Sequence, residues 1–305
     1  MAIGSVKVTV NGTTVEATSN GDGTYTATLA APNKTSYNVN AGHYYPVTVV
    51  ATNQAGTATT VNDTDGALGS SLRLYVKEVT APTISISAPT SGQYLATATP
   101  TITFTLTDEA NGSGIAITTL SFKVDGTTYT NTSSGVTVSS ITNGYNVTFV
   151  PQTALEDGTH TLTVNVKDND GNQATSASVG FTTDTVAPTL SVTNPSTSGG
   201  YVSASSLTVT GTTSDSTSGT PTIKITLNGS DVGSVTVSNG AFSKAIALRS
   251  GANTIVVTAT DLAGKVTTIT RTITLDTSSP VIASVSITPN PVNVGANYTV
   301  TITVE

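Results

Sequence analysis

The chain is poor in the residues that build large or covalently braced cores. Its 305 residues include no cysteine, no tryptophan, one methionine and five phenylalanines. Without cysteine there can be no disulfide, no thiolate zinc site and no thiol nucleophile. With so few aromatic side chains, we expect each core to be small and aliphatic. These shortages argue against one large globular enzyme.

Charge is scarce as well. Only 10% of the residues are charged, with 11 Lys and Arg against 18 Asp and Glu, for a formal net charge of −7. A nucleic-acid-binding protein needs clustered cations to neutralise phosphates, and here the basic residues are spread thinly. No apolar run approaches the roughly 18–20 residues that span a bilayer. We therefore predict neither a nucleic-acid partner nor a membrane partner.

The first residues lack the parts of a secretion signal. Residues 1–6 contain no basic segment and no apolar segment, and a strand-like run follows directly. Three interpretations remain open: the protein stays in the cell that makes it, it leaves by lysis, or its leader is not included.

The abundant residues are β-formers. Val, Ile, Thr and Tyr dominate the runs between turn residues. Three landmarks recur in one order: a strand ending in an Asn-Gly or Asp-Gly turn, a second glycine turn feeding a strand, and an alternating strand ending in a polar turn. They occupy residues 6–12, 23–25 and 47–56, then 120–126, 143–145 and 162–171, then 223–229, 239–241 and 255–264.

Proline-marked joints divide these repeats. Pro82, Pro188 and Pro280 lie 106 and 92 residues apart, and about 100 residues with seven short strands is typical of an immunoglobulin-type sandwich. We predict an all-β fold of tandem immunoglobulin-like β-sandwich modules in an elongated rod. The predicted segments are a partial or variant first module (1–79), a second module (80–185), a third module (186–277) and a C-terminal strand pair of an incomplete module (278–305).

The predicted strands can be placed individually in the two full modules. In the second module they are 83–89, 100–109, 118–125, 135–140, 144–151, 160–168 and 174–183. In the third module they are 189–194, 205–212, 222–228, 232–238, 241–248, 253–261 and 265–275.

The two ends of the chain break the repeat. The first module lacks the opening strand pair that precedes the first landmark in the other two, whereas residues 280–305 supply such a pair and then stop. Three explanations are open. The first module is a variant sandwich closed by the extra strand 72–77, with the tail docked on the third module; or the chain is cut from a longer one; or one chain's C-terminal pair completes the first module of the next chain or of a partner.

Complementation within one chain is disfavoured, because two sandwiches separate the ends and the joint at 276–280 is short. Complementation between chains would pair two exposed edges that otherwise promote aggregation.

Catalytic chemistry has few candidates. His43 and His160 both stand just before the third-landmark strand, and this equivalence predicts a structural role for each. The sequence has no Gly-x-Ser-x-Gly elbow, no Walker loop and no His-Glu-x-x-His run. We therefore predict a protein that is not an enzyme, with no catalytic residues and no cofactor-binding residues.

Metal binding has one local candidate. Residues 168–172 (DNDGN) place oxygen ligands at alternate positions, as calcium loops do. No glutamate follows at the EF-hand spacing, so an Asx-type hairpin turn is the favoured interpretation. Asp184 and Asp276 precede joint prolines and could clamp neighbouring modules through calcium. We nevertheless assign no metal-binding residues and no cofactor.

An aromatic cluster at His43, Tyr44 and Tyr45 offers two interpretations. It could stack against a sugar, or its tyrosines could fill a core edge or form a tyrosine corner.

Several stretches carry a resemblance to known proteins. The joint 184–188 (DTVAP) and the turn 259–264 (ATDLAG) resemble the tandem bacterial Ig-like modules of surface adhesins. Residues 42–49 (GHYYPVTV), 69–74 (GSSLRL) and 287–295 (ITPNPVNVG) resemble Ig-like-repeat proteins encoded among the tail genes of phages and prophages of Gram-positive bacteria. This resemblance implies a virion accessory or tail protein that can bind carbohydrate on the host surface.

From the sequence we therefore expect a non-enzymatic structural or adhesive component of a phage or phage-like particle. Its expected partners are other virion or tail proteins, copies of itself, and cell-surface carbohydrate. Its expected location is the virion, after synthesis in the host cytoplasm without a signal peptide. The alternatives are a secreted bacterial surface adhesin and spacer modules of a larger polysaccharide-acting enzyme.

Overall fold

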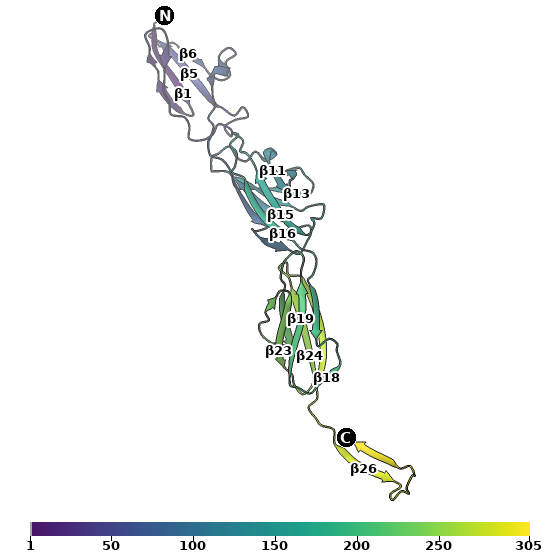
Figure 1. Ribbon diagram of the computed structural model, residues 1–305. Coiled ribbons are helices and arrows are strands. Elements are labelled where there is room, and N and C mark those ends of the chain that lie inside the picture. Colours follow the sequence, from purple (N-terminus) through teal and green to yellow (C-terminus); the bar gives the residue numbers. More distant parts are fainter. Residues whose placement is uncertain (1) are drawn as a thin grey trace. The chain divides into compact units, whose positions relative to one another are not determined.

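The computed structural model describes residues 2–305, and its regular elements are strands apart from two short 3-10 helices, η1 (Gly69–Leu72) and η2 (Ile117–Thr119). The chain divides into two compact units, Met1–Asp184 (unit 1) and Thr185–Glu305 (unit 2). Figure 1 shows the strands along the chain, coloured from purple to yellow. Over residues 2–305, no helix is long and apolar enough to cross a membrane.

The second module, within unit 1, is a sandwich of two sheets. One has the order β13-β14-β10-β8 and the other β12-β11-β15-β16-β9, with only β16 and β9 parallel among these neighbours. The strands of the first sheet are β8 (Thr83–Ala88), β10 (Ile102–Thr107), β13 (Val136–Ile141) and β14 (Gly144–Phe149). Those of the second are β9 (Gln93–Leu95), β11 (Ser121–Val124), β12 (Thr127–Thr130), β15 (Gly158–Asn165) and β16 (Ala177–Thr183).

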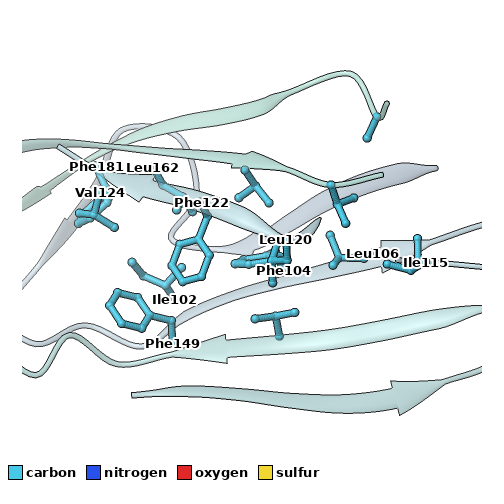
Figure 2. Close-up of a cluster of buried hydrophobic side chains, with 14 residues drawn as sticks. Ile102, Phe104, Leu106, Ile115, Leu120, Phe122, Val124, Phe149, Leu162 and Phe181 are labelled. Carbon is cyan, nitrogen blue, oxygen red and sulfur yellow. The ribbon is translucent and has the colours of Figure 1, made fainter. Parts of the chain in front are cut away.

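The core of this sandwich follows from strand alternation. In β10 every second side chain, Ile102, Phe104 and Leu106, is buried, because successive residues of a strand point to opposite faces. Phe122 of the facing sheet packs edge-on against Phe104, with ring centroids 5.4 Å apart, and Figure 2 shows the two side chains in one cluster. The expectation of a purely aliphatic core is wrong here, since four of the chain's five phenylalanines are buried in this module.

The third module, within unit 2, repeats the arrangement. Its sheets have the orders β17-β19-β23-β22 and β18-β25-β24-β20-β21. Their strands are β17 (Thr189–Asn194), β18 (Gly200–Val202), β19 (Ser206–Ser214), β20 (Thr222–Leu227), β21 (Ser230–Asp231), β22 (Val237–Ser238), β23 (Ala241–Ala247), β24 (Gly251–Thr260) and β25 (Val266–Leu275). Phe242 is the sole aromatic residue in a core otherwise made of Val, Ile, Leu and Ala.

The fold class is confirmed as all-β with tandem immunoglobulin-like sandwiches. Each strand predicted for the second and third modules has a counterpart with ends shifted by a few residues. One prediction was too long: residues 232–238 form a strand only at Val237–Ser238. Gly233, with a φ of 83°, lies within that stretch, and a left-handed residue interrupts a regular strand.

The main sheet of the first module has the order β2-β1-β5-β6, with a short strand β7 that pairs with β5. A separate minimal ribbon joins β3 and β4. The strands are β1 (Ile3–Val10), β2 (Thr13–Glu16), β3 (Thr18–Ser19), β4 (Tyr25–Thr26), β5 (Tyr45–Asn53), β6 (Ala58–Val61) and β7 (Arg73–Leu74). In chain order and pairing this sheet corresponds to β12-β11-β15-β16 of the second module, and β3 and β4 follow β2 along the chain as β13 and β14 follow β12.

The inner face of this sheet is only half covered. Val8 pairs with Val49 as Phe122 pairs with Val164 in the second module. Phe122 and Val164 are fully buried, whereas both valines remain partly exposed. Residues 2–79 supply no counterpart of β8 and β10, the strand pair that covers this face in the second module.

The C-terminal strand pair is an isolated antiparallel ribbon of β26 (Ile282–Thr288) and β27 (Thr299–Val304). Every residue in both strands is exposed. Neither strand buries a side chain, so docking of the tail on the third module stays a prediction. The ribbon matches the opening pairs β8-β10 and β17-β19, in which a proline likewise follows the first strand.

Candidate functional site

Three carboxylates come together at one end of the second module. Glu78 lies in the segment between β7 and β8, Asp108 directly follows β10, and Asp168 lies in the turn after β15. One oxygen atom from each lies within 4.8 Å of those from the other two. Tens of residues separate them in sequence, so the sandwich topology is what brings them together.

Backbone N–H groups orient all three side chains. The N–H of Ser113 donates to Oε1 of Glu78 at 2.5 Å, and the N–H of Gly114 donates to Oδ2 of Asp108 at 2.7 Å. Oδ1 of Asp168 accepts the N–H groups of Gly171 and Asn172 at 2.6 and 2.8 Å. The last pattern is the Asx-type turn expected from the sequence.

Several oxygen atoms of this cluster remain unpaired inside the protein. Oδ1 of Asp108, Oε2 of Glu78 and Oε2 of Glu109 are buried and have no hydrogen-bond partner. The ion pairs formed over residues 2–305 lie elsewhere, between His160 and Asp125 and between Lys224 and Asp231. Among the described residues, no ion pair therefore joins this cluster to a basic side chain.

The surroundings of the cluster shift the pKa of Glu78. Burial raises the pKa of the Glu78 carboxyl above its usual value, and the neighbouring Glu109 carboxyl raises it further. The hydrogen bond from Ser113 acts in the opposite direction. Two carboxyl groups that close disfavour ionisation together.

Asp170 fastens the connecting segment next to this cluster. Its Oδ2 accepts a hydrogen bond from the backbone N–H of Glu78 at 3.1 Å and another from the hydroxyl of Thr35. The side-chain amide of Asn172 donates to the carbonyl of Glu78 at 3.2 Å. Within unit 1, the loop 168–172 therefore holds Glu78 in place over the second module.

Sequence reasoning found only part of this arrangement. It singled out the loop that begins at Asp168 but did not connect Glu78 and Asp108 to it. The available signal was an acidic residue directly after the strand that ends at Thr107 and another in the turn after β15, with Glu78 in the segment before β8. The two other acidic candidates differ from each other: Asp184 is fully buried and its backbone N–H donates to Leu95, whereas Asp276 is exposed and its Oδ1 caps the N–H of Ser278.

His160 is a buried structural residue. Its Nδ1 contacts Oδ2 of Asp125 at 2.5 Å, and its Nε2 lies 2.8 Å from the hydroxyl of Thr183. In the third module Asn228 takes the place of Asp125 and Asn253 that of His160, and the side-chain amide of Asn228 donates a hydrogen bond to Oδ1 of Asn253 at 3.2 Å. This position joins the hairpin turn after β11 to the start of β15.

His43 is not the equivalent of His160, which corrects the sequence interpretation. Strand register places Tyr45, rather than His43, opposite the hairpin turn of the first module. His43 is exposed, has a φ of 59° and stacks on Tyr37, with ring centroids 4.2 Å apart. The sequence alignment failed because the pairing with β1 begins four residues after His43, at Val47, whereas the pairing with β11 begins only two residues after His160, at Leu162.

The aromatic cluster divides between core and surface. Tyr45 is buried, as the core-edge interpretation predicts, whereas Tyr44 donates to Oδ2 of Asp63 at 2.8 Å. That hydrogen bond raises the pKa of the Tyr44 hydroxyl. Arg73 lies over the Tyr44 ring at 4.8 Å, and Tyr75, which is 58% exposed, packs against it edge-on.

Comparison with known proteins agrees with the fold. A family described as bacterial Ig domain matches residues 82–164, and one described as glucodextranase, domain B, matches residues 188–277. The chain is an Ig-like repeat protein. Bacillopeptidase F of Bacillus subtilis (strain 168) is 34% identical over 137 residues, which are 45% of this chain and 9% of the relative's length.

Solved structures resemble the chain at the level of fold. The fibronectin(III)-like modules of Clostridium thermocellum CbhA are 18% identical, with a TM-score of 0.40, covering 63% of this chain and 94% of that one. The I-band fragment I67-I69 from titin is 12% identical, with a TM-score of 0.42, covering 89% of this chain and 87% of that one.

Proposed function

We propose that the chain is a non-enzymatic structural and adhesive component of a phage or phage-like particle, assembled from copies joined by strand complementation. The observation that carries this proposal is the match between the half-covered sheet of the first module and the isolated ribbon of β26 and β27. The sheet lacks an opening strand pair, and the ribbon is such a pair.

The missing sheet can be named strand by strand. In the second module the covering sheet has the order β13-β14-β10-β8. In the first module β3 and β4 stand for β13 and β14, so a ribbon supplying β27 beside β4 and β26 outside it would restore that order. β27 has one free edge, whereas β10 pairs on both of its edges.

The ribbon carries the side chains that this position requires. The register of β26 and β27 pairs Ile282 with Val304, Val285 with Ile302, and Ile287 with Val300. These six residues form one apolar face, and each is 44–63% exposed. Burying a Val or Ile side chain fully contributes about 1.5–3 kcal/mol, so the face is a substantial driving force for docking.

The test of complementation is the mass of the full chain by light scattering. We expect concentration-dependent association that disappears when residues 281–305 are deleted. Ile302→Asp should abolish association, because it places a charge on the apolar face. Thr301→Asp is the matched control, since Thr301 lies on the opposite face of the same strand, and should leave association intact. Equal association of all four proteins would overturn the proposal.

The absence of catalysis is tested directly. The two histidines have structural surroundings, which supports a connecting rather than a catalytic role. Purified chain incubated with casein or with bacterial cell-wall polysaccharide should release no product. Hydrolysis that co-purifies with the chain would contradict the proposal.

The particle location has its own test. Mass spectrometry of particles released by lysis should detect the chain at a fixed ratio to the other particle proteins. Detection only in the secreted or wall fraction of intact cells would favour the adhesin alternative.

A carbohydrate-binding role is favoured by the exposed Tyr75, which packs edge-on against Tyr44, while Arg73 lies over the Tyr44 ring. Aromatic faces with a polar neighbour suit sugar rings. Tyr75→Ala removes the exposed aromatic ring and should weaken binding to Gram-positive cell-wall polysaccharide by about tenfold or more. A tenfold loss of affinity corresponds to about 1.4 kcal/mol of binding free energy. Tyr201→Ala, at a residue that is 76% exposed, is the matched control; an equal effect of both substitutions would contradict the assignment.

A further inference from the structure

We propose that Glu78, Asp108 and Asp168 form a divalent-cation site that takes calcium and fixes the connecting segment onto the second module. All three residues belong to unit 1, and the site is independent of how copies of the chain assemble. The sequence candidate at residues 168–172 supplies only one of the ligands, and the other two come from separate elements.

The buried oxygens give the first reason. Asp108 is only 7% exposed, and its Oδ1 lies inside the protein without a hydrogen-bond partner. Oε2 of Glu78 is also buried and has no hydrogen-bond partner. A buried carboxylate oxygen without a partner is costly, and a cation bound between these oxygens would remove that cost.

The backbone makes room for the cluster. A Cβ atom added at Gly112 would lie 2.6 Å from Oε2 of Glu78 and 2.7 Å from Oδ2 of Asp108. Real Cβ atoms do not approach oxygen so closely, so the bare glycine lets the two carboxylates meet. The N–H groups of Ser113 and Gly114 each hold one oxygen of these two carboxylates, Oε1 of Glu78 and Oδ2 of Asp108, and the second oxygen of each has no hydrogen-bond partner.

The ligand chemistry selects calcium. Every candidate donor is a carboxylate oxygen, which suits a hard cation and does not suit the nitrogen- and sulfur-seeking Zn²⁺. Two oxygens on one Ca²⁺ lie at most about 4.8 Å apart, because each is about 2.4 Å from the ion, and the three oxygens satisfy that limit. Mg²⁺ demands a tighter octahedron, which ligands from three separate elements do not readily form.

The same arrangement recurs in part in unit 2. Asp215 directly follows β19 as Asp108 follows β10, and Asp261 directly follows β24 where Asp168 follows β15. A carboxylate oxygen of Asp215 lies within 4.8 Å of one of Asp261. Asp215 and Asp261 therefore repeat Asp108 and Asp168 in the third module, as expected if the two acids serve as a pair of ligands in both modules.

The consequence of binding is local order. Glu78 sits in the segment that joins β7 to β8, whereas Asp108 and Asp168 belong to the second module. An ion shared by the three would cross-link that segment to the module. Lys77, which is exposed and adjacent to Glu78, provides a trypsin site at which this order can be read out.

The experiment combines calcium titration with proteolysis on the full chain, after chelator treatment and dialysis. Titration calorimetry should show calcium binding at about 10⁻³ M or tighter. Asp108→Asn should bind one calcium ion fewer per chain, and Asp22→Asn, an exposed site in the same unit, should bind as the wild type does. Glu78→Gln is the second variant, in case Asp108→Asn fails to fold as judged by circular dichroism.

Trypsin gives the structural readout. Calcium should slow cleavage after Lys77 by about tenfold in the wild type and have no such effect in Asp108→Asn. Cleavage after Arg249 is the internal reference, because Arg249 is exposed and lies before β24, whereas Asp261 follows that strand. The absence of calcium binding by the wild type, unchanged binding by Asp108→Asn and Glu78→Gln, or equally tight binding of magnesium would each overturn the proposal.

Discussion

At the scale of single residues, two glycines set how closely neighbouring strands pack. A Cβ atom at Gly144 of β14 would lie 1.9 Å from the carbonyl oxygen of Leu106 on the adjacent strand. At Gly211 of β19 it would lie 2.1 Å from the carbonyl oxygen of Ser191. Each glycine therefore stands where the backbone of a partner strand leaves no space for a side chain.

Gly144→Ala should lower the free energy of unfolding of unit 1 by about 2–3 kcal/mol, because the backbone must shift to relieve the clash. Gly180→Ala is the matched control: it also lies in a strand, but its nearest neighbour, the carbonyl oxygen of His160, would be 3.8 Å away. Urea denaturation measures both. Equal losses from the two substitutions would mean that general strand propensity, rather than the clash, sets the cost.

Equivalent positions in the two modules of unit 1 differ in what they bury. Phe122 is fully buried and contacts the rings of Phe104, Phe149 and Tyr129. Phe122→Ala should cost about 3–5 kcal/mol. Val8→Ala, at the corresponding place in the half-covered sheet, should cost under about 1 kcal/mol in the monomer, because less apolar area is lost. Equal costs in urea denaturation would show that the face of the first module is already covered.

At the scale of elements, the ribbon of β26 and β27 is the least supported structure in unit 2. A two-stranded ribbon alone is marginally stable in water, and neither strand buries a residue. By contrast, β24 lies between β20 and β25 and alternates buried residues along its length.

Hydrogen exchange should therefore separate these elements. In dilute full-length protein, the amides of 282–304 should exchange orders of magnitude faster than those of β24. At concentrations where the chains associate, the ribbon amides should gain protection while those of β24 stay unchanged. Ribbon protection that is independent of concentration would be inconsistent with complementation between copies.

At the scale of the whole molecule, unit 1 and unit 2 have separate hydrophobic cores. Separate cores unfold as separate cooperative transitions. Calorimetry should resolve two main transitions, with Gly144→Ala lowering one and Gly211→Ala the other. A substitution in one unit that lowers both transitions equally would show that the units unfold together.

The sequence by itself determined the fold class and the succession of strands. Alternating Val, Ile and Thr residues choose a buried and an exposed face by local geometry, and residues such as Asn11, Asp125 and Asn228, all with positive φ, form the turns that their Asn-Gly and Asp-Gly pairs favour. The repeat of these signals also predicted the division into modules and the missing strand pair, since each signal is confined to a few consecutive residues.

Only the tertiary structure decided which distant residues meet. Glu78, Asp108 and Asp168 converge because strands β10 and β15, in opposite sheets, end at the same end of the sandwich, a fact that no local pattern carries. Strand register likewise made Tyr45, not His43, the first-module counterpart of His160, which contacts the hairpin turn of the second module. Four of the five phenylalanines share the core of the second module because strands of its two facing sheets carry them, whereas Phe242 lies in the core of the third module.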